Sequence, residues 1–167
     1  FSEVAGKGIA KMENAGIEVI VGGLEKESRK LNKRFFTFHE NKRPYIILKW
    51  AESKDGFIAP KNQTAPFWMT SDESKKLVHK WRAEEDAILV GRITAQKDNP
   101  SLTVRKVNDN NPIRIVIDKE LKLSSALNLF DSAAKTIIFN TVKTEEIDSN
   151  CFIKINFNNL IESILEE

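Results

Sequence analysis

The chain has 167 residues, of which 41% are hydrophobic and 30% are charged, and its formal net charge is +2. This length fits roughly one globular domain, and so small a net charge argues against a protein that binds nucleic acid or a membrane surface by bulk electrostatics. Cys151 is the single cysteine, which excludes an internal disulfide framework and a cysteine-rich zinc site and is compatible with a reducing cytosol. The longest apolar runs fall far short of the roughly 20 residues that a membrane span requires.

The N-terminal part of the chain predicts two helices and one strand. Apolar residues about three apart predict a short amphipathic helix over residues 6–15, which ends at Gly16. Residues 17–21 are typical of a strand. Residues 25–38 have a helical composition with apolar side chains on one face, and Pro44 ends this region because proline cannot continue a helix.

Residues 45–50 are nearly continuous in apolar character, with β-branched and aromatic side chains, and predict a central strand interrupted only by Lys49. Further on, Thr70 and Glu73 have the spacing of a capping box, so a helix is expected to begin there.

The rest of the chain alternates between strand and helix patterns. Parallel strands need a long crossover between them, so helix-length connections predict an α/β fold with a largely parallel sheet. The expected strands are residues 86–91, 114–118, 136–139 and 152–155, and short helices are expected at 124–131 and 158–166.

The common catalytic and nucleotide-binding motifs are absent from the sequence. It contains no G-x-G-x-x-G, no G-x-x-x-x-G-K-[ST] and no G-x-S-x-G, and neither His39 nor His79 lies in an H-E-x-x-H. Polar residues that follow the predicted strands are more informative, because ligands of open α/β sheets bind beyond the carboxyl ends of the strands. Such residues occur at 49–56, at 91–94 and at 118–119.

The order and spacing of these residues carry a resemblance. The pattern runs from Arg43-Pro44-Tyr45 through L-K-W-A-x-S-x-D-G-x-I-A, W-x-T, H-x-x-R-A-x-x-D-A-I-L-V-G-x-x-T and D-N-P-x-L-T-x-R to P-x-R-I-V-I-D, over residues 43–118. It closely resembles the reductase domain of the bifunctional deaminase-reductases of riboflavin biosynthesis. Residues 4–36 look like the tail of the deaminase domain of that family.

The resemblance implies a dihydrofolate-reductase-like, three-layer α/β fold with a mostly parallel central sheet, incomplete at the C-terminus. It implies a division into residues 1–42, a deaminase remnant with a connecting helix, and residues 43–167, the N-terminal portion of the reductase domain. The implied activity is the NADPH-dependent reduction of 5-amino-6-(5-phosphoribosylamino)uracil to its ribitylamino product. A cytoplasmic homodimer is implied as well.

The resemblance also assigns site residues by matching position. Lys49 and Asp98 are the expected catalytic residues. Pro66 stands where the family tends to have a small polar residue, so only the backbone of Pro66 is expected to contact the substrate. Cofactor contacts are expected from Ala51, Trp68, Thr94, Asp98 and Lys119, and substrate contacts from Pro66, Arg82, Leu102 and Arg105.

Parts of the family pattern are missing from this sequence. The zinc-binding H-x-E and P-C-x-x-C of the deaminase do not occur, so no metal is expected here. In the family, a Glu-Gly-Gly strand beyond the last residue of this sequence closes over the cofactor phosphates. We therefore expect this polypeptide alone to bind NADPH weakly and to turn over slowly or not at all. Two alternatives stay open: a non-catalytic fragment that dimerises, and a related dihydrofolate-type reductase.

Overall fold

The computed structural model describes residues 6–62, 68–105 and 110–166. The chain divides into two compact units, Phe1–Ile47 and Leu48–Glu167, which are described separately. Within the described residues, the helices are too short and too polar to traverse a lipid bilayer.

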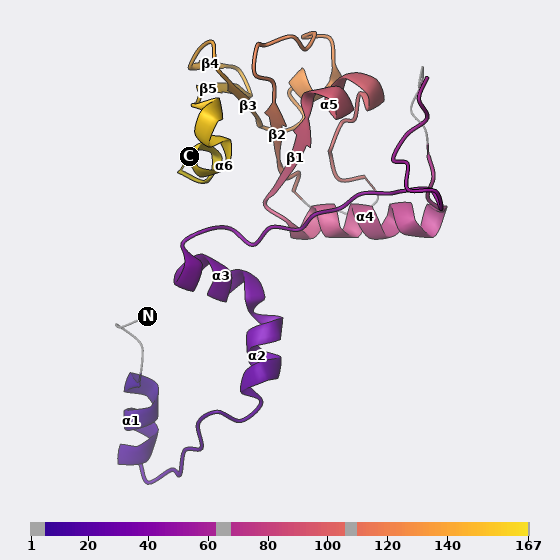
Figure 1. Cartoon of the computed structure of the whole chain (residues 1–167). Helices are drawn as coiled ribbons and strands as arrows, with labels where there is room; N and C mark the ends of the chain where they lie inside the picture. The colour runs from indigo at the N-terminus through magenta and orange to yellow at the C-terminus, as the bar shows by residue number, and fades with distance from the viewer. Residues whose placement is uncertain (1–5, 63–67, 106–109, 167) are drawn as a thin grey trace. The chain divides into compact units, whose positions relative to one another are not determined.

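The first unit is helical (Figure 1). It contains α1 (Lys7–Asn14), α2 (Glu25–Leu31) and α3 (Lys33–Asn41). The helix expected over residues 25–38 is therefore two helices, which meet at Asn32, where the side-chain Nδ2 donates to Ser28 O at 2.9 Å. The strand expected at residues 17–21 does not form, and Ile20 and Val21 are exposed.

The second unit contains the sheet. Its elements in chain order are α4 (Asp72–Glu84), β1 (Ala87–Gly91), α5 (Arg92–Asp98), β2 (Ile113–Ile117), the 3-10 turn η1 (Asn128–Phe130), β3 (Thr136–Asn140), β4 (Glu145–Ile147), β5 (Asn150–Lys154), the 3-10 turn η2 (Phe157–Asn159) and α6 (Leu160–Glu166).

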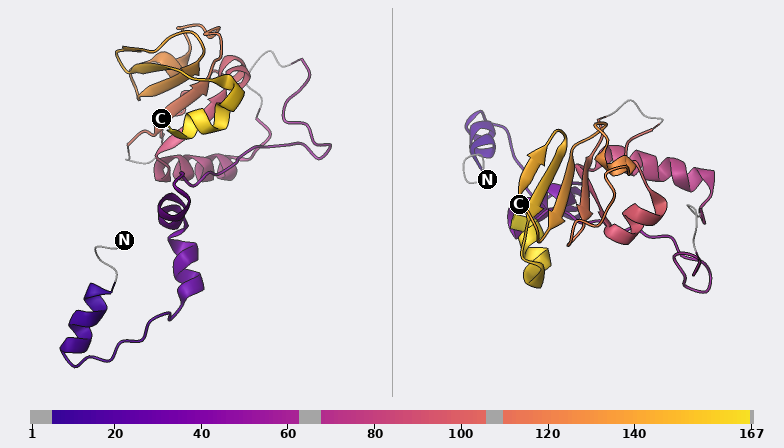
Figure 2. Two further views of the ribbon diagram at one scale, coloured as in Figure 1. Left: turned by 60° about the vertical axis from the view of Figure 1, so that its left-hand side comes forward. Right: turned by 90° about the horizontal axis from the view of Figure 1, so that it is seen from above.

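The strand order is β1-β2-β3-β5-β4, and every pairing except that of β4 with β5 is parallel. In the three views, α5 lies beside the β1 end of the sheet and α6 beside the β5 end (Figures 1 and 2). The predicted α/β class with a mostly parallel sheet is thus confirmed.

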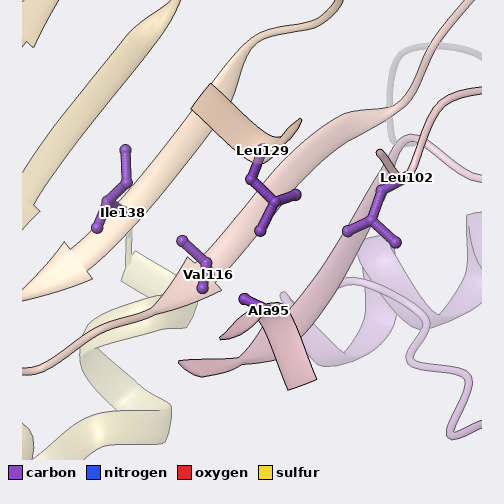
Figure 3. Close-up of a cluster of buried hydrophobic side chains, with 5 residues drawn as sticks. All are labelled: Ala95, Leu102, Val116, Leu129 and Ile138. Carbon is purple, nitrogen blue, oxygen red and sulfur yellow. The ribbon is translucent and has the colours of Figure 1, made fainter. Parts of the chain in front are cut away.

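The hydrophobic core lies on one face of this sheet. Val116 of β2 and Ile138 of β3 stand side by side there, and α5, the loop after it and η1 each contribute one buried side chain (Figure 3). Those three side chains are Ala95, Leu102 and Leu129. Ala95 is fully buried because α5 packs directly on β1 and β2, and its small side chain permits that close approach.

Several predicted elements differ from the structure. The central strand expected at residues 45–50 is absent, and Leu48 and Trp50 are 79% and 64% exposed. α4 is capped by Ser71, whose Oγ accepts from Ser74 N at 3.3 Å, one residue after the predicted Thr70. The helix expected at 124–131 is only the single turn η1, and the sequence patterns missed α5 and β4.

Candidate active site

The carboxyl ends of β1 and β2 bring two of the predicted cofactor residues to one edge of the sheet. Gly91 and Ile117 are register partners, so the residues that follow them leave the sheet at the same level. Thr94 lies in the first turn of α5, directly after β1, and Lys119 lies just after β2. Both side chains are exposed, so a hydroxyl and an ammonium group are accessible at the edge where α/β proteins bind ligands.

The segment between α5 and β2 is held in place by side-chain hydrogen bonds. It begins directly after Asp98, the last residue of α5 and an exposed carboxylate. Asn99 adopts a left-handed conformation, with φ of 40°, and its Oδ1 accepts from Asn128 N at 2.8 Å. Asn128 Nδ2 returns a bond to Asn99 O at 2.9 Å. Leu102, expected to face the substrate, is 6% exposed and belongs to the hydrophobic core. Its buried side chain therefore holds this segment against the sheet.

Helix α4 also binds the segment between α5 and β2. Arg82 Nη1 donates to Thr103 O at 2.8 Å, and the backbone N of Arg105 donates to His79 Nδ1 at 3.4 Å. The backbone N of Val104 donates to Asn111 Oδ1 at 2.8 Å. These bonds bring Arg82 and Arg105, which are 23 residues apart in sequence, into one cluster with Leu102.

The two arginines make this cluster strongly positive. Burial, and then the positive charge of Arg105, lower the pKa of Arg82 below its usual range. Arg82 Nε is buried and has no hydrogen-bond partner among the described residues. An unpaired buried donor and two neighbouring like charges are both costly, and an anion that accepts from the guanidinium removes both costs. The arrangement can therefore bind a phosphate or carboxylate group.

Arg114 of β2 links the segment between α5 and β2 to the sheet. Its guanidinium is fully buried beneath β2, and each nitrogen donates to an oxygen of a neighbouring segment. The acceptors are Thr136 Oγ1, Ser101 O, Asn128 O, the side chain and backbone of Asp131, and Ala134 O, at distances between 2.6 and 3.4 Å. Arg114 lies within the family pattern of the sequence, which assigns it no role, although a charge inside an apolar strand is itself a signal.

Asp131 is the charged partner of Arg114, at 2.7 Å, and makes folding sensitive to acid. The hydrogen bond from Arg114 holds the pKa of Asp131 below its ordinary value of 3.8. A lowered folded-state pKa contributes stability that is complete above the unfolded value and is lost as the pH falls through the folded value.

We therefore expect Asp131→Asn to destabilise the chain at pH 7 and to unfold like the parent chain once the pH is well below 3.8. Urea unfolding at pH 7, at pH 5 and at a pH well below 3.8 measures this, and Asp86→Asn, at an exposed carboxylate, is the matched control. An equal difference between parent and Asp131→Asn at every pH would contradict the role of the charge.

The remaining predicted residues lie in the segment that precedes α4. Lys49 is exposed and outside the sheet, and Ala51 is half-buried. Trp68 is 68% exposed, with the ammonium of Lys75 5.0 Å from its ring centroid. Pro66 lies outside the described residues. The structure thus brings Arg82 and Arg105 together and, separately, brings Thr94 and Lys119 to one edge of the sheet. No strand positions Lys49, Ala51 or Trp68.

The described residues contain no group of three or more histidine, cysteine or acidic side chains arranged to hold a metal ion.

Comparison with known proteins decides the family. The model of the family described as "RibD C-terminal domain" matches residues 44–166. The chain belongs to the RibD C-terminal domain family. The riboflavin biosynthesis protein RibD of Aquifex aeolicus is 45% identical over 147 residues, and that of a Synechocystis strain is 39% identical over 142 residues. These matches cover 87% and 84% of this chain but 41% and 38% of the two relatives.

Solved structures agree. A diaminohydroxyphosphoribosylaminopyrimidine deaminase/5-amino-6-(5-phosphoribosylamino)uracil reductase from Thermotoga maritima superposes with a TM-score of 0.83 and 36% identity, over 98% of this chain and 46% of that chain. RibD of Acinetobacter baumannii superposes with a TM-score of 0.79 and is 28% identical, over 98% of this chain and 48% of that chain. The RibD C-terminal domain here thus has the expected dihydrofolate-reductase-like α/β fold. The chain spans about two fifths of the length of the curated relatives it matches.

Proposed function

We propose that this RibD C-terminal domain carries the NADPH-dependent reduction of 5-amino-6-(5-phosphoribosylamino)uracil to its ribitylamino product, a step of riboflavin biosynthesis. The observation that supports it most is the pair of Arg82 and Arg105, with the unpartnered Nε of Arg82. Two guanidinium groups suit the phosphate end of a phosphoribosyl substrate, because each can bind phosphate oxygens through two parallel N–H groups.

The cofactor assignment rests on the residues at the ends of β1 and β2. A cationic Lys119 and a hydroxyl-bearing Thr94 at one edge fit a phosphate-bearing dinucleotide, and an exposed Trp68 offers a flat apolar face. Asp98 and Ala51 complete this proposed set. When bound, NADPH supplies the hydride.

The protein residues supply position and protons. The ribose ring opens to expose an electrophilic C1′, which accepts a hydride, and a proton completes the reduction. We assign the proton donor to the ammonium of Lys49, with the carboxylate of Asp98 beside the reacting sugar. Leu102, whose side chain is in the core, contributes through its backbone, held by the bonds to Asn99 and Thr103.

The direct test follows the nicotinamide absorbance of NADPH mixed with this chain and the phosphoribosyl substrate. We expect a loss of absorbance that depends on the substrate and that is at least tenfold slower with the dephosphorylated nucleoside, because one charge-assisted contact is worth about 1.5–3 kcal/mol. The chain mixed with NADPH alone is the control. Equal rates with both substrates would contradict the role of the arginine pair.

A non-catalytic role in assembly is the second candidate, and two observations favour it. β1 is an edge strand of the sheet, and apolar side chains of the preceding segment, including Leu48 and Trp50, are exposed. An unpaired strand edge and exposed apolar side chains each favour association. The chain is then a dimer by light scattering with no substrate-dependent loss of NADPH, whereas the enzymatic proposal requires that loss whatever the oligomeric state.

Residues 1–42 have their own proposed origin. We assign them to the end of a deaminase domain and the connection into the reductase domain. In support, the similarity to the Thermotoga maritima structure extends over 98% of the chain, well beyond residues 44–166. A third reading, a dihydrofolate-type reductase, leaves the first 42 residues without an explanation.

A further inference from the structure

Helix α4 directs two side chains, about one turn apart, at the segment that carries Arg105. His79 and Arg82 are separated by three positions and therefore lie on the same face of the helix. Arg82 donates to the carbonyl of Thr103, and His79 Nδ1 accepts from the backbone N of Arg105 at 3.4 Å. The Arg105 residue itself is exposed, so its guanidinium is accessible to a ligand while its backbone is held by α4.

Successive residues of this segment each use a backbone group to bind a side chain from elsewhere in the fold. Thr103 and Arg105 bind α4, and between them the backbone N of Val104 donates to Asn111 Oδ1 at 2.8 Å. Ordering a backbone costs conformational entropy, and a segment that is already ordered does not lose this entropy again when a ligand binds. The bonds therefore preorganise the backbone from which the Arg105 side chain extends.

The bond to Arg105 also defines the protonation of His79. A backbone N–H can only donate, so the Nδ1 that accepts from it carries no proton, and an imidazole with one unprotonated nitrogen is uncharged. Charge matters at this place because the positive charge of Arg105 already lowers the pKa of Arg82. A third cation would add repulsion, and a carboxylate would compete with an anionic ligand for the two guanidinium groups. An uncharged acceptor avoids both effects.

We infer, building on the proposed phosphoribosyl substrate, that His79 is a positioning residue for phosphate recognition. Its uncharged Nδ1 holds the backbone of Arg105 so that the guanidinium groups of Arg105 and Arg82 bind one phosphate. The property required of residue 79 is then an uncharged hydrogen-bond acceptor attached to Cγ. Asparagine has this property, because its Oδ1, like Nδ1 of histidine, is bonded to Cγ.

Ribose 5-phosphate is the probe, because it presents the phosphate end of the substrate without the pyrimidine. Its affinity is measured from the amide signals of the isotope-labelled chain, and the exchange of the Arg105 amide proton with water reports on the bond to His79. His79→Leu removes the acceptor and is expected to speed this exchange and to weaken binding by about 2- to 10-fold, the value of one hydrogen bond. His79→Asn is expected to retain the exchange rate and the affinity of the parent chain.

His79→Asp separates position from charge. Its carboxylate can accept from the Arg105 amide, so slow exchange is expected to persist, whereas its negative charge beside the two guanidinium groups is expected to make phosphate binding weaker than in His79→Asn. A merely structural role of His79 would change exchange and affinity together in every variant. His39→Leu, at the half-buried histidine of α3, is the control and is expected to change neither.

Three results among the variants would overturn the proposal. They are an unchanged exchange rate or affinity in His79→Leu, a loss in His79→Asn as large as in His79→Leu, and equal phosphate binding by His79→Asp and His79→Asn. His79→Ala, which favours a helix, takes the place of His79→Leu if that variant does not fold.

The parent chain separates this proposal from the proposed reductase. A parent chain without saturable binding of ribose 5-phosphate would also overturn the role of His79. The oxidation of NADPH is measured separately. Histidine variants that leave phosphate binding unchanged therefore do not contradict the reductase, and binding in the expected order without NADPH oxidation contradicts the reductase alone.

Discussion

Replacing Arg114 with methionine is expected to lower the free energy of unfolding by about 3–5 kcal/mol, because several oxygens lose their donor and each buried group left unsatisfied costs about 1–3 kcal/mol. The side chain is fully buried and binds β3, η1 and the segment after α5 at once. Methionine fills similar space but leaves the carbonyls of Asp131 and Ala134 without donors. Since a domain is stable by only about 5–15 kcal/mol, this loss is large.

Urea unfolding followed by circular dichroism measures the effect. Arg43→Met makes the same chemical change at an exposed arginine that donates to Pro44 O, and we expect its cost to stay within about 0.5 kcal/mol. If Arg114→Met were as stable as Arg43→Met, the hydrogen bonds around Arg114 would contribute nothing net. Arg114→Lys should be almost as damaging, because an ammonium lacks the planar fork that reaches several oxygens at once.

Replacing Arg82 with alanine is expected to weaken binding of the phosphoribosyl substrate by about 10- to 100-fold, because a charge-assisted contact to phosphate is lost. The affinity of Arg82→Lys for this substrate should fall between those of the parent chain and Arg82→Ala, since lysine keeps the charge but lacks the planar guanidinium. Calorimetric titration with the phosphorylated substrate and with the dephosphorylated nucleoside separates a phosphate contact from a general loss. Only the phosphorylated substrate should lose affinity.

The control for Arg82 lies on the same helix. Lys80 is exposed and its ammonium is 3.9 Å from Glu84, so Lys80→Ala removes a cation from α4 without touching the cluster. Its affinity should match that of the parent chain. Because Arg82 also donates to Thr103 O, the melting temperature of Arg82→Ala must be measured. Equal losses for both substrates would mean that Arg82 only supports the fold.

Local sequence predicts the strands of the sheet well. β1, β2 and β3 are short apolar runs that contain β-branched residues, and each of them, like β5, forms within two residues of the prediction. Such a run is suited to a strand buried on both faces, whatever its neighbours are. α5 was missed because its seven residues, RITAQKD, are too few for a helical period and begin directly after a strand.

Residues 45–50 illustrate the opposite case. Their composition is as typical of a strand as that of β2, but a strand exists only where a neighbour supplies hydrogen bonds, and in this structure none pairs with them. The position of Lys49, predicted from the end of that strand, changes for the same reason. Asn32 ends α2 because its side chain binds the Ser28 carbonyl, a competition that apolar periodicity does not register.

The single cysteine excludes an internal disulfide framework, and the small net charge argues against binding of nucleic acid by bulk electrostatics. The order and spacing of residues 43–118 by themselves carry the resemblance to the family. The sequence also determined which types of side chain are available at the strand ends. Only the tertiary structure decided that Arg82 and Arg105 meet, that Leu102 is buried, and that Arg114 binds oxygens of several segments. Such juxtapositions depend on how distant segments pack, and no local pattern encodes them.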